Sequence, residues 1–413
     1  MDPKLNDIHT NMKLSSIWQN QNFVLLWMGT SLSNFTFHIF RLALPLIVYD
    51  LTKSTFSMGT MKVIEILPNI LFGMIVGVIV DRINRKRVIL GAIGIQVLIL
   101  GAIIILIDTE TLQMWHLYLL GFALYTCGYT FGNAYHTVLP LLVNKKQLTS
   151  ANATLNFLET FIDLVGPAFA GFILFSMDYK IGLTVTVIGL FSLLIFSYFI
   201  KVPVEKPKQI YDERKSIWSE MKEGWQHLVE VRSLWLATLM ILNVNIATGA
   251  SSAILVFYAV DSLALSEYEL GIVFSGTAIG GMLGSLVAKK SLKWCKRGYL
   301  FLYALIGLSL GQLINFMSTN WYTLMLGMFF IGLFGVTINI HYFTIRQEST
   351  PNYLLGRVAG TSSMLMKMAA PISFLTVGVL GEIVPVNYVF IGSSLLLLLL
   401  TICFFNTSLR YIE

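Results

Sequence analysis

Residues 77–87 read GVIVDRINRKR, and in this stretch a long apolar run meets a cluster of basic side chains. The preceding apolar run has about the length that a helix needs to cross a lipid bilayer, roughly 20 residues. Similar runs recur along the chain, as in residues 88–107 and 395–405. Of the 413 residues, 56% are hydrophobic and 12% are charged, whereas soluble chains have roughly 45–50% apolar and about 25% charged residues. The composition therefore indicates a membrane protein.

The apolar runs predict an all-α fold with twelve transmembrane helices. We place these helices at residues 22–49, 57–80, 88–107, 115–143, 150–176, 181–201, 234–260, 270–290, 299–318, 322–345, 360–384 and 387–405. Their connections are short except for one. We therefore expect a six-helix bundle over residues 1–201, a linker over 202–233, and a second six-helix bundle over 234–413.

The linker contains the stretch SIWSEMKEGWQHLVEVRSLW at residues 216–235. Its apolar side chains recur at helical spacing, which predicts an amphipathic helix lying at the membrane surface. The predicted apolar face consists of Ile217, Met221, Trp225, Leu228 and Val229. A plain soluble linker helix is the alternative.

Lysine and arginine are distributed unequally between the two sides of the predicted helices. One side carries the clusters Arg82–Arg87 and Lys289–Arg297, and the other carries Lys53, Lys62 and Lys180. Because short basic loops stay in the cytoplasm, we expect both termini to be cytoplasmic. The net charge of +6 is then explained by the basic cytoplasmic loops. Nothing further in the sequence supports nucleic-acid binding.

The motifs of several enzyme classes are missing from the sequence. It has no phosphate-binding Walker A loop, no HExxH helix and no GxSxG elbow. The three cysteines Cys127, Cys295 and Cys403 show no metal-binding or disulfide spacing. We therefore expect no enzymatic activity, no cofactor and no metal.

The two halves of the chain are weakly similar to each other. LPLIVYD ends at Asp50 and ILVFYAVD ends at Asp261, an offset of 211 residues. DLVGP at residues 163–167 has a counterpart in KMAAP at 367–371, and in both a charged residue stands four before a proline. Two parallel repeats are the architecture of one large class of transporters.

The opening stretch resembles the loop signature G-x-x-x-D-R-x-x-R-K of the major facilitator superfamily. The matching residues are Gly77, Asp81, Arg82, Arg85 and Lys86, and Asn84 stands where the family often has glycine. The resemblance implies that two six-helix bundles rock about a central site and that this segment acts as a conformational gate.

Other stretches are similar to one branch of that superfamily, which contains macrolide efflux pumps and enterobactin-type siderophore exporters. They include ALPLIVYDLTKS at 43–54, GPAFAG at 166–171 and RQESTPNYLLGRVAG at 346–360. The Gly-Pro pair in the fifth predicted helix resembles the antiporter motif of the superfamily. The resemblance implies a bacterial exporter in the cell membrane.

Four ionisable residues inside predicted helices are candidates for proton coupling. They are Arg41, Glu65, Glu159 and Asp163. A charge inside the membrane is costly and normally faces a cavity or a partner, and two adjacent acids in a low dielectric raise each other's proton affinity. Arg41 and Glu65 lie at matching depth, so an ion pair between them is expected. Salt-bridged acids with a purely structural role remain the alternative.

A central cavity would be lined by polar groups of the inner helices. The candidates are Asn34, His38, Tyr125, Tyr129, Asn133, His136, Asn243, Asn245, Asn339, His341 and Lys367. Lys367 could lie near Glu65 or Asp81, or its ammonium group could extend to the membrane surface. The histidines could equally form hydrogen bonds between helices.

These patterns predict a secondary active transporter that exports an amphipathic small molecule, such as a macrolide-like drug or a siderophore, in exchange for protons. The expected partners are that substrate, protons and the lipid bilayer, with the protein working as a monomer. Movement of a lipid or lysophospholipid between leaflets and uptake of a small molecule remain as alternatives.

Overall fold

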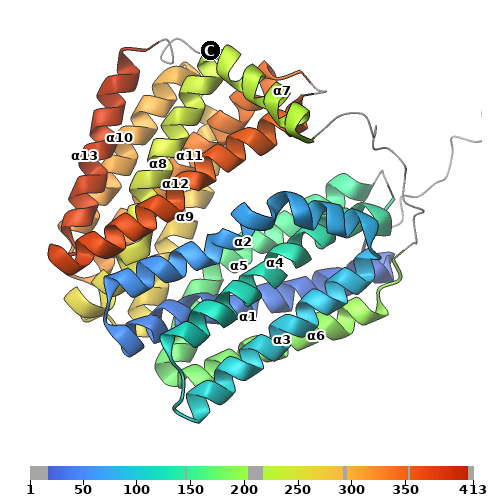
Figure 1. Cartoon of the computed structure of the whole chain (residues 1–413). Coiled ribbons are helices and arrows are strands. Elements are labelled where there is room, and N and C mark those ends of the chain that lie inside the picture. The colour runs from blue at the N-terminus through green and yellow to red at the C-terminus, as the bar shows by residue number, and fades with distance from the viewer. Residues whose placement is uncertain (1–16, 145–146, 203–216, 292–294, 352–353, 408–413) are drawn as a thin grey trace, which may run out of the picture.

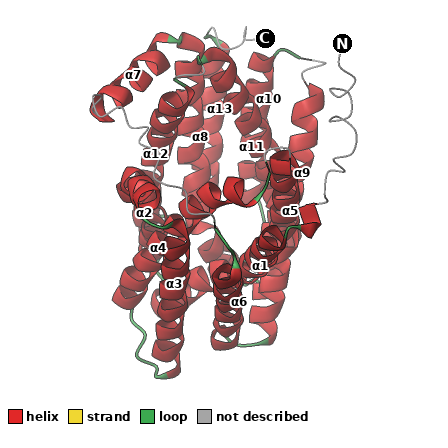
Figure 2. Cartoon of the chain, turned by 90° about the vertical axis from the view of Figure 1, so that its right-hand side faces the viewer, coloured by secondary structure: helices red, strands yellow, loops and turns green. Residues whose placement is uncertain are grey.

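The computed structural model describes residues 17–144, 147–202, 217–291, 295–351 and 354–407. In this part all regular secondary structure is helical, and loops join the helices (Figure 2). The first group of helices is α1 (Gln21–Thr52), α2 (Thr55–Arg82), α3 (Arg85–Asp108), α4 (Met114–Leu142), α5 (Leu148–Ser176) and α6 (Tyr179–Phe199). The second group is α8 (Arg232–Phe257), α9 (Glu267–Ser291), α10 (Arg297–Phe316), α11 (Trp321–Ser349), α12 (Leu355–Ile383) and α13 (Tyr388–Phe405). Helix α7 (Ile217–Glu230) lies between them in sequence, and short 3-10 and π-helical turns cover Ile17–Gln19 and Tyr258–Ser262.

The predicted all-α fold is confirmed, with a helix at each of the twelve expected positions. Within the described residues, ten helices are long and apolar enough to cross a membrane. Several helices begin at a side-chain cap, as at Asn20, Asp178 and Asn320, because the first backbone N–H groups of a helix have no partner inside it. Asn84 caps α3 by accepting from the backbone N–H groups of Lys86 and Arg87, which gives a physical reason for its departure from the family signature.

The two groups of helices are inclined to each other and form a V (Figure 1). Between the groups, α2 packs against α12 and α5 packs against α9. We call the end that carries the α1–α2, α5–α6, α8–α9 and α12–α13 connections the closed end. The opposite end, where α6 finishes and α7 begins, is the linker end, and the two groups diverge toward it (Figure 1).

Hydrogen bonds join the two groups at the closed end. Tyr49 donates to Asp261 at 2.9 Å. Glu382 of α12 accepts from the hydroxyl of Ser54 at 2.7 Å, from the hydroxyl of Thr55 at 3.2 Å and from the backbone N–H of Phe56 at 3.1 Å. Glu382 therefore caps the N-terminus of a helix that belongs to the other group, where a negative charge is favourable.

Four glycines allow the helix backbones of the two groups to touch near the closed end. A Cβ added to Gly271 of α9 would collide with the Pro167 carbonyl and lie 3.0 Å from the Cα of Gly171 in α5. A Cβ added to Gly59 of α2 would lie 2.5 Å from the Phe374 carbonyl, four residues before Gly378 of α12.

These two contacts have the same geometry. In each, a glycine of one helix faces the carbonyl four residues before the partner glycine. The reverse direction repeats this relation, because Gly171 faces the carbonyl of Glu267 and Gly378 faces that of Thr55. Small residues permit such close approach between membrane helices. The two helix pairs therefore form equivalent glycine crossings, and these hold the closed end together.

Helix α7 forms where an amphipathic helix was predicted, and one side of it packs against the second group. Gly224 packs against the Arg357 carbonyl of α12, Glu223 forms an ion pair with Arg357, and His227 lies 3.1 Å from the Ser349 carbonyl. Leu228, predicted on a lipid-facing stripe, is fully buried. The helix is therefore docked on the second group, because its small and polar residues match the ends of α11 and α12.

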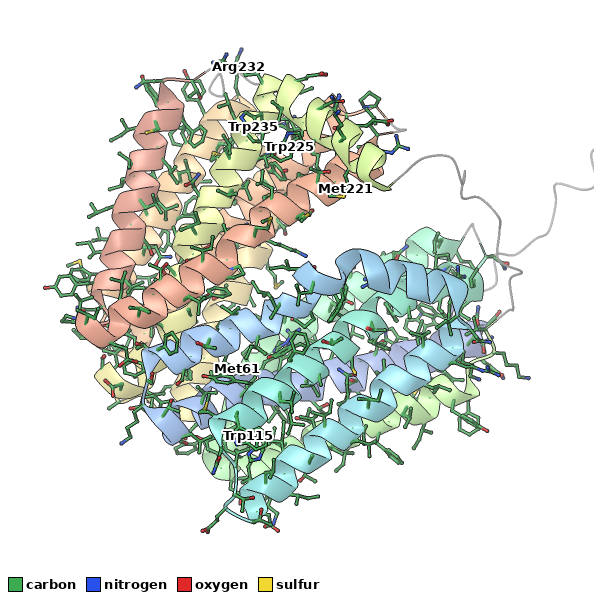
Figure 3. All side chains as sticks on the ribbon, in the orientation of Figure 1. Met61, Trp115, Met221, Trp225, Arg232 and Trp235 are labelled. Atoms are coloured by element: carbon green, nitrogen blue, oxygen red, sulfur yellow. The ribbon has the colours of Figure 1, made fainter. Side chains whose placement is uncertain are left out.

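The remaining predicted apolar face of α7 is partly exposed. Trp225 and Val229 are 44% and 41% exposed. Trp225 packs edge-on against Trp235 of α8, with their ring centroids 5.7 Å apart (Figure 3). The side chain of Ile217 and residues 203–216 of the linker lie outside the described part of the chain.

Candidate functional site

A cavity of about 620 Å³ lies between the two groups of helices. Its walls come from α1, α2, α4 and α5 of the first group and from α8, α9 and α11 of the second. Most of the lining is apolar, and the lining side chains that carry or can acquire a charge are His38, Arg41, Lys62, Glu65 and Asp163. An apolar cavity with a few convergent polar groups is the usual form of a small-molecule site. Tyr125, another predicted residue, also lines it.

His38 and Asp163 form the central polar contact of this cavity. His38 Nε2 lies 3.2 Å from Asp163 Oδ1. The His38 side chain is 10% exposed, whereas that of Asp163 is 62% exposed, so the carboxyl group is open to the cavity. Gly166 makes room for the imidazole, because a Cβ at that position would lie 2.6 Å from His38 Cδ2. Both residues were predicted separately, but their pairing depends on the register between α1 and α5.

The expected ion pair between Arg41 and Glu65 does not form. Glu65 is bound instead by Lys62, one turn earlier on α2, with Nζ and Oε2 2.9 Å apart. The Arg41 guanidinium lies 5.6 Å from the centre of the Phe37 ring on its own helix, a cation–π contact. Each charge thus has a local partner on its own helix, and both side chains still line the cavity.

Prolines follow three of the charged cavity residues at the same spacing. Pro45, Pro167 and Pro371 lie inside α1, α5 and α12, four residues after Arg41, Asp163 and Lys367. Proline has no N–H, so it cannot bond to the carbonyl four residues back. The carbonyls of Arg41, Asp163 and Lys367 therefore receive no hydrogen bond from the residue four positions later.

Lys367 lines a second cavity of about 420 Å³, together with Asn69 and Asn245. Its ammonium group donates to Asn69 Oδ1 of α2 at 3.2 Å, across the two groups of helices. The predicted neighbour Glu65 is held by Lys62 instead, and the side chain of Asp81 lies outside the described part. Lys367 therefore faces a cavity between the two groups, and the alternative of a position at the membrane surface does not hold.

Several predicted cavity residues do not line either of these two cavities. They are Asn34, Tyr129, Asn133, His136, Asn243, Asn339 and His341. Asn133, Asn243 and Asn339 each donate to the carbonyl four residues earlier in their own helix, so their amides are satisfied locally. His341 is 2% exposed and packs edge-on against Phe301 between α10 and α11. Glu159 is exposed but also lies outside both linings.

The residues of the predicted gate fall at the junction of α2 and α3. Gly77, Asp81 and Arg82 belong to the last turns of α2, and their side chains lie outside the described part of the chain. Arg85 begins α3. Lys86 donates to the Tyr198 carbonyl of α6 at 2.6 Å and lies over the Tyr198 ring. In the described residues no group of three His, Cys, Asp or Glu side chains is placed to hold a metal ion.

The sequence matches known proteins over most of its length. The profile described as Major Facilitator Superfamily matches residues 26–372. The chain is 22% identical over 394 residues to macrolide efflux protein A of Streptococcus pyogenes, covering 92% of this chain and 94% of the relative. It is 23% identical over 364 residues to enterobactin exporter EntS of Escherichia coli O1:K1 / APEC, covering 84% and 82%.

Solved structures share the architecture at low sequence identity. The nucleoside transporter NupG superposes with a TM-score of 0.70 at 13% identity, covering 93% of this chain and 98% of NupG. A bacterial homologue of the iron transporter ferroportin, in an inward-facing state, superposes with a TM-score of 0.67 at 16% identity, covering 95% and 100%. At these identities the likeness shows the fold alone.

Proposed function

The chain belongs to the Major Facilitator Superfamily of membrane transporters, and from this membership we propose that it is a proton-coupled exporter. It moves an amphipathic small molecule, a macrolide-like drug or a siderophore, out of a bacterial cell by alternating access. The named efflux relatives support export and these two substrate classes. The rocking bodies are residues 1–201 and 234–413, and one copy of the chain supplies both walls of the cavity.

The structure corresponds, in this proposal, to the conformation that is open to the cytoplasm. The closed end faces outward, and the linker end and both termini lie in the cytoplasm. The charge distribution supports this orientation, because the closed end carries Lys53 and Lys180 while the basic clusters belong to the other side. Lys180 is moreover paired with Asp108. Lys62 belongs to the cavity rather than to a loop.

The observation that carries the proposal is the Asp163–His38 pair inside a cavity shared by both groups. A carboxyl group open to the cavity takes up a proton when the cavity faces the acidic outside and releases it toward the cytoplasm. Exchange requires that the proton and the substrate favour different states of the same site. The other charged groups around this cavity are Arg41, Lys62 and Glu65.

Everted membrane vesicles that contain the protein are expected to accumulate radiolabelled erythromycin or enterobactin when their lumen is acidic. The lumen then corresponds to the outside of the cell, so protons leave as the substrate enters. For one-to-one exchange, each pH unit supports about ten-fold accumulation, because one unit is worth about 1.36 kcal/mol. Nigericin, which collapses the gradient, is the control. Accumulation of both substrates that is indifferent to nigericin would show that protons do not drive transport.

Replacing Glu382 with glutamine is expected to weaken the contact between the two groups of helices at the closed end. The carboxylate binds three donors at the start of α2, and hydrogen bonds to a charged group contribute about 1.5–3 kcal/mol. Loss of the charge should raise the outward-open fraction by about ten-fold. The measurement uses Ser252→Cys, a cavity position, in a chain whose native cysteines are replaced, with membrane-impermeant maleimide added outside.

The matched control is Glu269→Gln at the same end of the molecule. Glu269 accepts from Ser266 at the start of its own helix, so its change leaves the contact between the groups intact. Maleimide labelling at position 252 from outside should rise in the Glu382 variant and stay constant in the Glu269 variant. Equal labelling rates in both variants and the parent would contradict the claim that Glu382 holds the two groups together at the closed end.

A further inference from the structure

The second cavity adjoins the first but differs from it in charge. Ser252 and Thr277 line both cavities. The first cavity contains two acids and two bases besides His38, whereas Lys367 is the one charged residue among those that line the second. A ligand that spans both cavities therefore meets carboxyl groups at one end and an ammonium group at the other.

Lys367 has a neutral partner within the protein. Its ammonium group is exposed to the cavity and donates to the amide oxygen of Asn69 at 3.2 Å. Glu65, one turn earlier on the same helix, is neutralised by Lys62. An amide dipole does not compensate a full charge at membrane depth, and charges there normally have a counter-charge or line an aqueous pathway. Lys367 lines a cavity, and an anion bound there would supply the counter-charge that the described side chains do not.

Buried polar groups at the same cavity also lack partners. Gln312 is fully buried, its Oε1 accepts from Ser251 at 2.8 Å, and its Nε2 has no hydrogen bond in the described structure. The hydroxyl of Thr277, on the boundary of the two cavities, is likewise unpaired. Buried polar groups are nearly always hydrogen-bonded. These two atoms are enclosed by protein, so they make the wall of the cavity polar without reaching a ligand in it.

We propose that the second cavity binds an anionic group of the transported molecule, a carboxylate or a phenolate, with Lys367 as its counter-charge. The apolar part of that molecule packs against Leu255, Met366 and Phe390, which also line this cavity. The inference rests on the proposed export function and adds a substrate class to it. The anionic group of the substrate is recognised by Lys367 of the second group, separately from the Asp163–His38 pair of the first.

The test compares two dyes that share the xanthene ring system and differ in charge. Fluorescein is an anion and rhodamine 6G is a cation. The full-length protein and its variants are placed in phosphatidylcholine vesicles, which have no net charge, and binding is measured by fluorescence polarisation. Lys367→Met should weaken fluorescein binding about ten-fold or more, the usual effect of losing a charged hydrogen bond. Rhodamine 6G should bind as before, and Lys367→Arg should retain fluorescein binding.

Lys180→Met is the matched control, because Lys180 is a lysine at the closed end paired with Asp108. Loss of both dyes in Lys367→Met would assign the lysine a structural role and overturn the proposal. Absence of fluorescein binding by the parent protein would overturn it as well. If phosphatidylglycerol added to the vesicles displaces fluorescein from the parent protein and leaves the residual binding of Lys367→Met unchanged, Lys367 binds a lipid headgroup and the substrate assignment is wrong.

Transport measurements on the same vesicles separate this inference from the proposed function. If fluorescein binding depends on Lys367 but neither dye is moved by a pH gradient, the anion subsite stands and proton-coupled export fails. If a pH gradient moves rhodamine 6G in the parent and in Lys367→Met alike, while fluorescein binding is the same in both, export stands and the subsite fails.

Discussion

Gly271→Leu is expected to abolish transport and to leave the outer end of the cavity open. The Gly271 backbone touches α5 at Pro167 and Gly171, so any side chain there pushes the two helices apart. Overpacking of this kind costs about 1–3 kcal/mol, which changes the ratio of two conformations about five-fold to more than a hundred-fold. The substitution therefore destabilises the inward-open state, in which these two helices touch. The outward-open state, in which they separate at this end, is favoured. Uptake into everted vesicles and maleimide labelling from outside in the Ser252→Cys background give the two readouts.

Gly101→Leu in α3 is the control for Gly271→Leu. A Cβ at Gly101 meets nothing within 4 Å, so a similar side chain is added inside a helix without a collision. This variant should fold and transport like the parent. Thermal stability in detergent shows whether each variant is folded. A folded Gly271→Leu protein with normal uptake would mean that the glycine crossing is not needed for the cycle.

Asp163→Asn is expected to uncouple transport from the pH gradient. The amide has nearly the same shape as the carboxyl group, but it does not bind and release a proton at the position beside His38. Accumulation driven by an acidic lumen should fall to the level seen with nigericin, a loss of about ten-fold for each pH unit of gradient. Movement of substrate down its own gradient should persist, because the cavity walls are otherwise unchanged.

Glu159→Gln tests which of the two acids of α5 carries the proton. Glu159 lies one turn from Asp163 but outside the lining of both cavities, so its loss should leave proton-driven accumulation within about two-fold of the parent. The opposite pattern, with uncoupling in Glu159→Gln and normal coupling in Asp163→Asn, would move the proton site toward the linker end. Coupling that survives in both variants and in the double variant would exclude this helix as the proton carrier.

The sequence predicts the charged residues of the site better than the neutral ones. Of the five charged candidates, Glu159 lies outside both linings, and the other four, Arg41, Glu65, Asp163 and Lys367, line a cavity. The cost of burying a charge in the membrane forces it toward a partner or an aqueous pathway. Neutral polar residues have no such constraint. An asparagine such as Asn243 satisfies its amide on its own helix, and so its presence in a span says little about which face it occupies.

Contacts between helices could not be predicted from the sequence, for a different reason. The partner of His38 depends on how neighbouring helices are rotated and shifted, and one sequence does not fix these quantities. The glycine crossings were hidden because the chain has 32 glycines, and membrane helices contain many that pack against nothing. Gly271 and Gly101 look alike in the sequence, yet one touches a neighbouring backbone and the other faces open space.

The docking of α7 has a consequence for how the linker transmits motion. Because α7 is fixed to α12 by Gly224 and by the Glu223–Arg357 pair, it moves as a rigid part of the second group whenever that group rocks. Motion of the second group relative to the first then changes the distance between the end of α6 at Phe199 and the start of α7 at Ile217. A dye on α7 would report the position of the second group, and its distance from the end of α6 would measure the opening angle of the transporter.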